Sequence, residues 1–185
     1  ANVLVKKLSS VESLGAAQVI CTDKTGTLTK NEMTVVSFVS AGTSYEVTGT
    51  GYLPQGTFLH DGKKILKDAM PKIRDFLLIG VYASNARIEA PDDHSKEWYC
   101  IGDPTEGSLI VVAKKADINT GDENQPVEIK ELPFDSFRKI MTSIRKFPDN
   151  SIVAYVKGAP ENVLAKCTHI KVGEVVRRIT EKDKE

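Results

Sequence analysis

A polar stretch that follows an apolar run is the feature that most constrains this chain. Residues 19–21 read Val-Ile-Cys and have the apolar character of a buried strand. Residues 23–29 read Asp-Lys-Thr-Gly-Thr-Leu-Thr, which places a carboxylate at the strand end and a glycine where a tight turn is needed. A strand that ends in a turn with a carboxylate and three hydroxyls predicts a phosphate site that contains a nucleophile.

Asp23 is the candidate nucleophile. A carboxylate can attack the terminal phosphorus of a nucleoside triphosphate and hold the phosphoryl group as an acyl phosphate. Thr25 points to the same side as Asp23 where strand geometry continues, and Gly26 lets the following amides approach phosphate oxygens. The tetrapeptide Asp-Lys-Thr-Gly alone is also typical of an ordinary surface turn, whereas the complete string favours the phosphate site.

The stretch resembles the phosphorylation signature of the P-type cation-transporting ATPases. Residues 8–15 and 30–35 also resemble that family, in particular the branch of the calcium and sodium/potassium pumps. The resemblance implies that Asp23 and Thr25 are catalytic in an ATP-driven cation translocase with ATP and Mg²⁺ as cofactors. It also implies that the Asp23 side chain and the Thr25 backbone carbonyl bind Mg²⁺ together with the rest of the phosphorylation domain. Calcium is the favoured cation, although the residues that choose the ion are not in this sequence.

Two other functions remain open. The stretch also resembles the haloacid-dehalogenase superfamily, whose phosphatases usually carry a second Asp two residues after the nucleophile. Thr25 stands at that position and cannot efficiently activate water, so we expect a persistent phosphoenzyme rather than a simple phosphatase. The second alternative is a non-catalytic nucleotide-sensing module.

Composition narrows the class of protein. Among 185 residues, 25 Lys and Arg balance 25 Asp and Glu, so nothing indicates a nucleic-acid partner. With 41% hydrophobic and 27% charged residues, we expect a globular, soluble and monomeric chain. Cys21, Cys100 and Cys167 are odd in number and widely separated, which indicates reduced thiols. The resemblance implies a cytoplasmic domain of an integral membrane protein, with its phosphorylation, actuator and transmembrane domains as partners.

Periodicity and turn residues predict the elements of the first half. They are a helix over 3–14, a strand over 17–21, a hairpin from 33–39 and 45–48, a loop over 49–62, a helix over 65–87 starting near Pro71, and a strand over 98–101. Asp103 as N-cap, Pro104 and Glu106 predict a capping box that opens a helix to about residue 116, before a polar loop over 117–125.

The second half reads as strands followed by a helix and a hairpin. We expect antiparallel strands over 127–132, 139–145 and 152–156, a helix from Pro160 to 166, a hairpin over 170–179 turning at Gly173, and a frayed tail over 181–185. The fold class is therefore α+β, a mostly antiparallel twisted sheet flanked by helices. By the resemblance, the domains are a phosphorylation-domain piece over 1–30, a helix and strand of α/β haloacid-dehalogenase-like type, then a nucleotide-binding domain over 31–180 and a tail over 181–185.

Two further segments resemble the adenine-binding segments of the family. They are residues 132–139 and 156–161. A purine needs a flat apolar partner, and Phe134 can supply it, since base–aromatic stacking is worth about 1–3 kcal/mol. Lys157 fits deep in the pocket, with Gly158 leaving room beside it, whereas Phe137 is expected in the core or at the rim.

The resemblance adds four nucleotide-binding residues. Glu106 matches a glutamate that contacts the adenine amino group, and capping remains its alternative role. Met141 matches an apolar pocket residue. Arg138 and Lys139 are candidates for the triphosphate; which of them serves stays open, because Ser136 stands where calcium-pump relatives often carry arginine. No Gly-x-x-x-x-Gly-Lys-Ser/Thr loop exists, so side chains hold the nucleotide and its affinity is modest.

The later motifs of the phosphorylation domain should lie beyond residue 185. We therefore expect this chain alone to bind ATP without phosphorylating Asp23 at a useful rate.

Overall fold

The structure is a computed structural model that describes residues 6–7, 9–65, 71–118 and 125–184. The chain divides into two compact units, one ending at Asn31 and the other beginning at Glu32. Each unit is described by itself below.

The first unit holds a short helix and a tight turn. Helix α1 spans Ser9–Gly15, and a turn over Lys24–Leu28 is closed by the Thr29 N–H donating to the Lys24 carbonyl at 3.1 Å. The strand predicted over 17–21 is absent: Val19 and Ile20 are 78% and 87% exposed. A strand requires a partner for its backbone, and no described segment pairs with this one. Part of the predicted helix over 3–14 lies outside the described residues.

The second unit opens with a four-stranded antiparallel sheet. It is formed by β1 (Ser37–Ser40), β2 (Thr43–Val47), β3 (Phe58–His60) and β4 (Lys63–Lys64), in that order. Ala41 and Gly42 both have positive φ, +50° and +77°, as a two-residue hairpin turn that matches strand twist requires. The hairpin was predicted, whereas β3 falls in the predicted loop over 49–62 and β4 directly follows it.

Two helices form the centre of this unit. Helix α2 spans Pro71–Tyr82 and α3 spans Pro104–Lys115. The predicted helix over 65–87 is thus shorter at its C-terminal end, and residues 66–70 lie outside the described residues. Beyond α2 the chain forms β5 (Arg87–Glu89), which pairs antiparallel with β6 (Tyr99–Ile101). The local sequence did not predict that β5 pairs with β6, because a strand three residues long gains its backbone partners from elsewhere in the chain.

A three-stranded antiparallel sheet follows. It consists of β7 (Val127–Asp135), β8 (Ile140–Lys146) and β9 (Ile152–Gly158). All three strands were predicted, but β7 continues three residues further than expected and carries Phe134 on its last part.

The C-terminal part is a helix, a hairpin and one helical turn. Helix α4 spans Pro160–Leu164, and β10 (His169–Val172) pairs with β11 (Val175–Arg178) across Gly173, as predicted. The predicted frayed tail instead forms a 3₁₀ helix over Glu181–Asp183. Arg177 donates to Asp183 at 2.6 and 2.7 Å and, with Thr180, lowers the pKa of that carboxyl.

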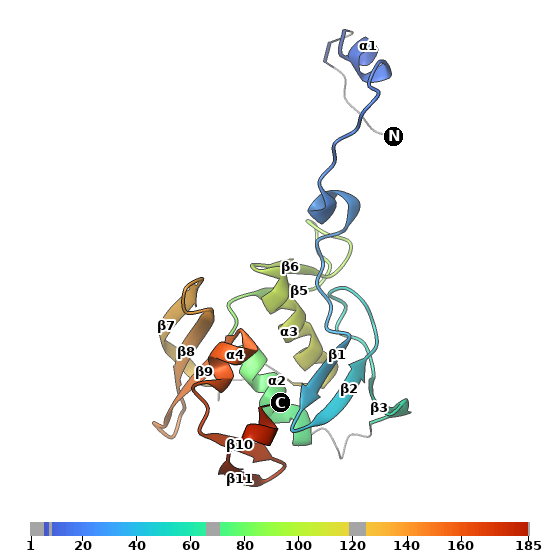
Figure 1. Cartoon of the computed structure of the whole chain (residues 1–185). Coiled ribbons are helices and arrows are strands. Elements are labelled where there is room, and N and C mark those ends of the chain that lie inside the picture. The colour runs from blue at the N-terminus through green and yellow to red at the C-terminus, as the bar shows by residue number, and fades with distance from the viewer. Residues whose placement is uncertain (1–5, 8, 66–70, 119–124, 185) are drawn as a thin grey trace. The chain divides into compact units, whose positions relative to one another are not determined.

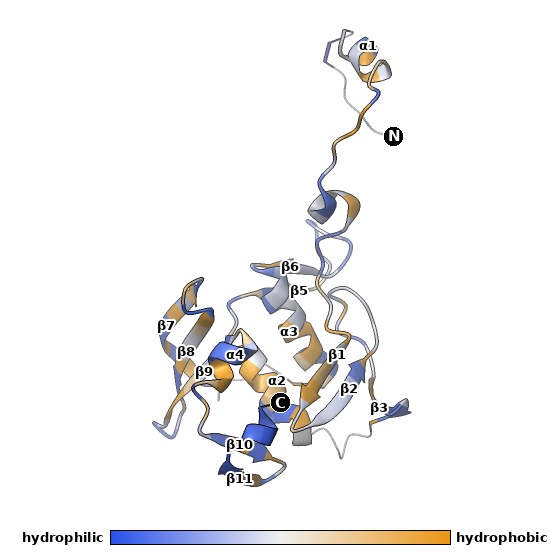
Figure 2. Cartoon of the chain, viewed as in Figure 1, coloured by the Kyte–Doolittle hydropathy of each residue, from blue (hydrophilic) through white to orange (hydrophobic). Residues whose placement is uncertain are grey.

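The main hydrophobic core is built around helices α2 and α3. Buried residues from β2, β3, α2, α3 and the residues just after α3 make one cluster, namely Val47, Phe58, Ile73, Leu77, Val81, Tyr82, Val112, Ala113 and Ile118. Figure 1 shows α2 and α3 between the β1–β3 strands and the β7–β9 sheet, and Figure 2 shows apolar colour on these helices and on β1, while the β10–β11 hairpin is mostly hydrophilic.

The α+β class with antiparallel sheets is confirmed. The strands form four small sheets in the described residues rather than a single twisted one. The first unit contains a short helix, α1, but the strand expected for a phosphorylation-domain piece is not formed. None of the described helices has both the length and the apolar composition needed to span a bilayer.

Candidate functional site

The register of the β7–β9 sheet brings three of the predicted site residues into one row. Met141 on β8 lies directly opposite Lys157 on β9. On the other side, β7 shifts register between Leu132 and Asp135, so that Pro133 and Phe134 both lie opposite Met141. Such a bulge places two residues against one and re-aims the bulged side chains. Phe134, Met141 and Lys157 therefore lie at the same level of three adjacent strands.

The three side chains of the row differ in their exposure to solvent. Met141 is 3% exposed and forms part of the core, whereas Phe134 is 63% exposed. An aromatic ring left this open at the end of a strand can stack on a planar ligand. Phe137, predicted to pack in the core or at its rim, is 93% exposed. That prediction was wrong because Phe137 lies in the turn between β7 and β8, where Asp135 accepts from the Phe137 N–H at 3.0 Å.

Lys157 and Glu106 form the charged centre of the site. The Lys157 Nζ donates to Glu106 Oε1 at 2.6 Å, and these side chains are 25% and 16% exposed. Lys157 also donates to Ser84 Oγ at 3.3 Å. An ion pair this far from water is maintained only when its remaining polar atoms also find partners. The ion pair therefore joins strand β9 to helix α3 at the level of the Phe134–Met141–Lys157 row.

Glu106 is held by backbone donors as well. Its Oε2 accepts from the Asn85 N–H at 2.8 Å and the Ala86 N–H at 3.1 Å. With Lys157, these bonds use three of the roughly four lone-pair positions of a carboxylate, which leaves acceptor capacity for a ligand. The predicted capping box is therefore only half formed, because the Glu106 carboxylate is used here and not on the helix N-terminus.

Asp103 supplies the helix cap by itself. Its Oδ1 accepts from the Thr105 N–H at 2.8 Å and from the Glu106 N–H at 3.1 Å. The bond from the Glu106 N–H is the main reason that the pKa of Asp103 is lowered. The cap fixes the first turn of α3 and with it the direction in which Glu106 leaves the helix.

The two candidate cations differ in their surroundings. Arg138 Nη2 donates to the Pro133 carbonyl at 2.9 Å and lies 4.0 Å, through Nε, from Asp135. Lys139 is exposed, with a φ of +56° in the same turn. The turn therefore engages the guanidinium of Arg138, and the ammonium of Lys139 extends from a constrained backbone position.

Gly158 is required by the closeness of β8. A Cβ at this position would lie 2.3 Å from the Lys139 carbonyl oxygen and 2.7 Å from Ile140 Cγ2. Gly158 pairs with Ile140, so the glycine sets the spacing of the two strands next to Lys157. The sequence suggested only that a small residue makes room for Lys157.

Asp23 and Thr25 lie in the first unit. The Thr25 N–H donates to Asp23 Oδ1 at 3.4 Å, and the Gly26 N–H donates to Thr29 Oγ1 at 3.3 Å. All of these residues are exposed. Within the described part of the chain, no group of three or more His, Cys, Asp and Glu side chains could hold a metal ion. The predicted Mg²⁺ ligands, the Asp23 carboxylate and the Thr25 carbonyl, both offer oxygen, the donor that a hard cation prefers.

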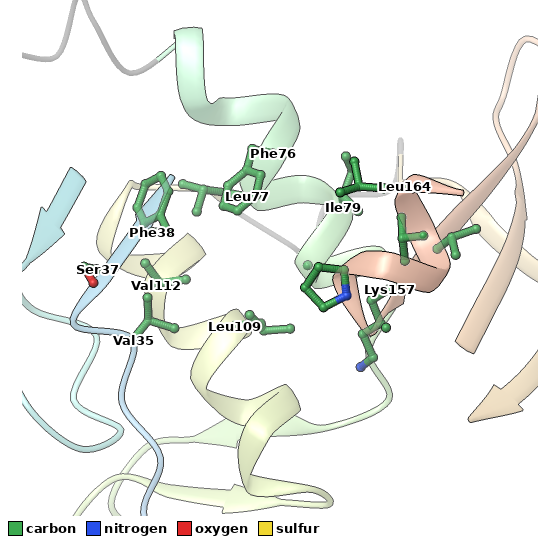
Figure 3. A pocket seen from close by; sticks show the side chains of 15 residues that line it. Val35, Ser37, Phe38, Phe76, Leu77, Ile79, Leu109, Val112, Lys157 and Leu164 are labelled. Carbon is green, nitrogen blue, oxygen red and sulfur yellow. The ribbon is translucent and has the colours of Figure 1, made fainter. Parts of the chain in front are cut away.

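Two cavities lie beside the site, and each is lined in part by its residues. An apolar groove of about 420 Å³ is lined by residues of β1, α2, α3, β9 and α4, with Phe38 and Lys157 at opposite sides (Figure 3). A polar cavity of about 620 Å³ includes Ser84 and Asn85. Neither is lined by Phe134 or Glu106, whereas Lys157 and Gly158 both line the apolar groove.

Sequence reasoning missed two residues in the segment after α2. Ser84 and Asn85 contact Lys157 and Glu106, yet they fell inside the predicted helix over 65–87. No local signal marks them, because their partners are about 20 to 70 residues away in the chain.

Comparisons with known proteins identify the family of this chain. The family model described as "P-type ATPase, cytoplasmic domain N" matches residues 72–185. The chain is 40% identical over 169 residues to a calcium-transporting ATPase of Bacillus subtilis, and this match covers 90% of the chain and 18% of the relative. It is 37% identical to the cation-transporting ATPase pma1 of Synechocystis, over 90% of the chain and 18% of that relative. It is 38% identical to the human calcium-transporting ATPase type 2C member 2, over 97% of the chain and 19% of that relative.

The chain thus spans about a fifth of the length of these relatives. The family model covers well over half of the chain and includes the strands and helices that carry Glu106, Phe134 and Lys157. The chain belongs to the P-type ATPase family and contains a cytoplasmic domain N of that family.

Proposed function

We propose that this chain binds ATP through Glu106, Phe134 and Lys157, and that in the complete protein ATP phosphorylates Asp23 to drive cation transport. The observation that carries the proposal is the Lys157–Glu106 ion pair at 2.6 Å. Lys157 lies in the same row of the sheet as Phe134, whose ring is 63% exposed. A charged pair shielded from water next to an open ring provides both the polar and the apolar contacts that a purine needs.

The adenine ring would stack on Phe134. The remaining acceptor capacity of the Glu106 carboxylate would take one N–H of the 6-amino group, while the ammonium of Lys157 holds the other carboxylate oxygen in place. Met141 provides an apolar floor between Phe134 and Lys157. Gly158 holds β8 and β9 at the spacing that this floor requires.

The phosphates would be bound by the turn between β7 and β8. Lys139 is exposed there, whereas Arg138 is already engaged by the Pro133 carbonyl. We therefore assign the triphosphate contact to Lys139 in the first place, with Arg138 shaping the turn. Ammonium groups on flexible stems follow a mobile triphosphate with little geometric demand.

The transfer step would take place at Asp23. One carboxylate oxygen forms a bond to the γ-phosphorus while the bond from that phosphorus to the β,γ-bridging oxygen breaks, and ADP leaves with the electron pair. Mg²⁺, when bound, neutralises charge on the transferred group. Because Thr25 offers no carboxylate as a base for water, the acyl phosphate at Asp23 persists. We propose that the remaining domains of the protein complete the metal site and later supply the base.

The membrane setting and the ion are also proposals. Two of the relatives described above are named as calcium-transporting ATPases, which supports a calcium pump in which this chain is a cytoplasmic portion of an integral membrane protein. The phosphorylation, actuator and transmembrane domains would then be its partners.

Removal of the stacking ring tests the nucleotide site. In a calorimetric titration of the 185-residue chain with ATP, Phe134→Ala should weaken binding by about five- to a hundredfold, because stacking is worth about 1–3 kcal/mol. Phe137→Ala is the matched control: its ring is 93% exposed in the adjacent turn and should change the dissociation constant less than about twofold. Equal losses in both variants, or no binding by the unaltered chain, would overturn the site.

A second experiment tests Asp23 as the nucleophile. In the full-length protein, Asp23→Asn should abolish the acid-stable, hydroxylamine-sensitive label transferred from γ-labelled ATP, because an amide cannot form the acyl phosphate. ATP affinity of the 185-residue chain should stay unchanged by the same substitution, and that chain alone should acquire no label. Label retained by the Asn variant would contradict the assignment.

A further inference from the structure

The segment between α2 and β5 connects the two halves of the proposed site. Its Asn85 N–H donates to Glu106 Oε2 at 2.8 Å, and its Asn85 Nδ2 donates to Glu131 Oε2 at 2.8 Å. Glu106 belongs to the half that recognises the 6-amino group. Glu131 lies on β7, three residues before the stacking ring of Phe134.

We propose that Asn85 and Glu131 form a positioning pair that sets the distance between the Glu106 carboxylate and the Phe134 ring, and with it the preference for adenine. This inference rests on the proposed ATP-binding function. Neither residue needs to touch the nucleotide.

The Asn85–Glu131 hydrogen bond matters because β7 contains a bulge. The ladder between β7 and β8 is regular at Glu131 and Leu132, which pair with Ser143 and Thr142, and resumes only at Asp135. Pro133 and Phe134 therefore lie in the part of β7 that the ladder does not fix. The side chain of Glu131, on the last regular stretch before the bulge, links β7 to the segment that holds Glu106.

Further hydrogen bonds hold the segment between α2 and β5 in place. Ser84 and Asn85 both contribute to the charged centre: Ser84 Oγ accepts from Lys157 Nζ, and its own hydroxyl donates to the Gly80 carbonyl at 2.6 Å. On its other side, the Tyr82 carbonyl accepts from Arg145 Nε on β8 at 2.9 Å. The segment is thus anchored to α2 and β8, so a displacement of β7 would change the position of Phe134 relative to Glu106.

The contact is suited to positioning more than to stability. Asn85 is exposed and Glu131 is half-buried, so water can replace the bond when it is lost. A solvent-accessible hydrogen bond adds little to folding, but it restricts where β7 lies. In the proposed site, ATP binding requires contacts with Phe134 and Glu106 at the same time. ITP has an oxygen in place of the 6-amino group, so it needs only the ring and can follow a shifted β7.

The test compares ATP and ITP binding to the 185-residue chain by calorimetry, with thermal unfolding measured in parallel. Asn85→Ala and Glu131→Ala should each raise the ATP dissociation constant about three- to tenfold, as expected for a lost positioning hydrogen bond. The ITP constant should change less than about twofold. The double variant should lose no more than either single one, since both remove the same contact.

Two controls separate positioning from general destabilisation. Glu131→Gln retains an acceptor oxygen and should keep the adenine preference of the unaltered chain. Glu181→Ala is matched in residue type, and its carboxylate contacts Lys184 at 2.8 Å far along the chain from the site. Glu181→Ala should leave the ATP and ITP dissociation constants unchanged. All variants should unfold within about 3 °C of the unaltered chain.

The outcomes are distinct. An unchanged ratio of ATP to ITP constants, equal losses for both nucleotides, or additive losses in the double variant would overturn the positioning pair while leaving the ATP site in place. Absence of ATP binding by the unaltered chain would overturn the proposed function and this inference with it.

Discussion

Lys115 illustrates what a single buried side chain contributes to this fold. It is 8% exposed, and its Nζ donates to the carbonyls of Thr48 and Gly49, each at 2.9 Å. No acidic group is among these contacts, so burial lowers the pKa of the ammonium. The last turn of α3 thereby holds the loop that leads from β2 to β3.

Replacement of Lys115 should cost stability in a way that depends on pH. Lys115→Met removes two hydrogen bonds, and we expect a loss of about 1–3 kcal/mol in the free energy of unfolding. The unfolded lysine binds its proton up to a higher pH than the native one, so native stability rises as pH increases through the lowered pKa toward 10.5. Denaturant unfolding of both proteins should therefore show a gap that widens in this alkaline range; a gap that narrows would contradict the lowered pKa.

At the scale of elements, the start of α3 depends on a close approach to β6. An added Cβ at Gly107 would lie 2.5 Å from Cys100 Sγ and 3.3 Å from Ile88 Cδ1. Gly107 thus allows the helix to lie against the β5–β6 pair, where Ile88, Ile110 and Val111 form a second small core with Tyr52. The same turn of α3 carries Glu106, so the packing at Gly107 also determines where the site carboxylate lies.

Gly107→Ala tests this close approach. Alanine is favoured over glycine in a helix by about 1 kcal/mol, yet we expect a net loss of about 1–2 kcal/mol from the overpacking against Cys100. Combining Gly107→Ala with Cys100→Ala removes the sulfur and should recover most of that loss, measured by denaturant unfolding. A Gly107→Ala chain as stable as the unaltered one would show that α3 does not need this contact.

At the scale of the whole molecule, the core belongs to the second unit. Every described residue from 6 to 31 whose exposure is defined is exposed, whereas the buried clusters all lie beyond Glu32. Thr34 and Val36, near the start of the second unit, are already bonded within it: the Thr34 hydroxyl accepts from the Gly51 N–H at 3.0 Å, and the Val36 carbonyl accepts from the Val47 N–H at 2.8 Å. The boundary after Asn31 therefore separates a folded body from a segment that buries little of its own surface.

Removal of residues 1–31 tests that boundary. The chain over 32–185 should unfold within about 3 °C of the full sequence, because both buried clusters lie within that range. Its ATP affinity should also stay the same, since Glu106, Phe134 and Lys157 all lie beyond the cut. A large drop in the unfolding midpoint would mean that the first unit supports the second through contacts that its exposure does not indicate.

The sequence by itself determined the features that depend on neighbouring residues. The turn at Gly42, the cap at Asp103 and the turn at Gly173 were all predicted, because each requires a particular residue at a particular backbone conformation. The family was also predicted from the stretch that begins at Asp23, and the comparisons confirm it. The assignment of individual site residues, including Phe134 and Lys157, remains a prediction.

Only the tertiary structure decided which distant groups meet. It placed Lys157 on Glu106, drew Glu106 away from the expected capping box, and brought Asn85 between Glu106 and Glu131. It also left residues 17–21 unpaired and exposed Phe137. The physical reason is the same in each case: a carboxylate, an amide or a strand edge is satisfied by whichever partner the fold brings near, and that choice leaves no mark on the adjacent sequence.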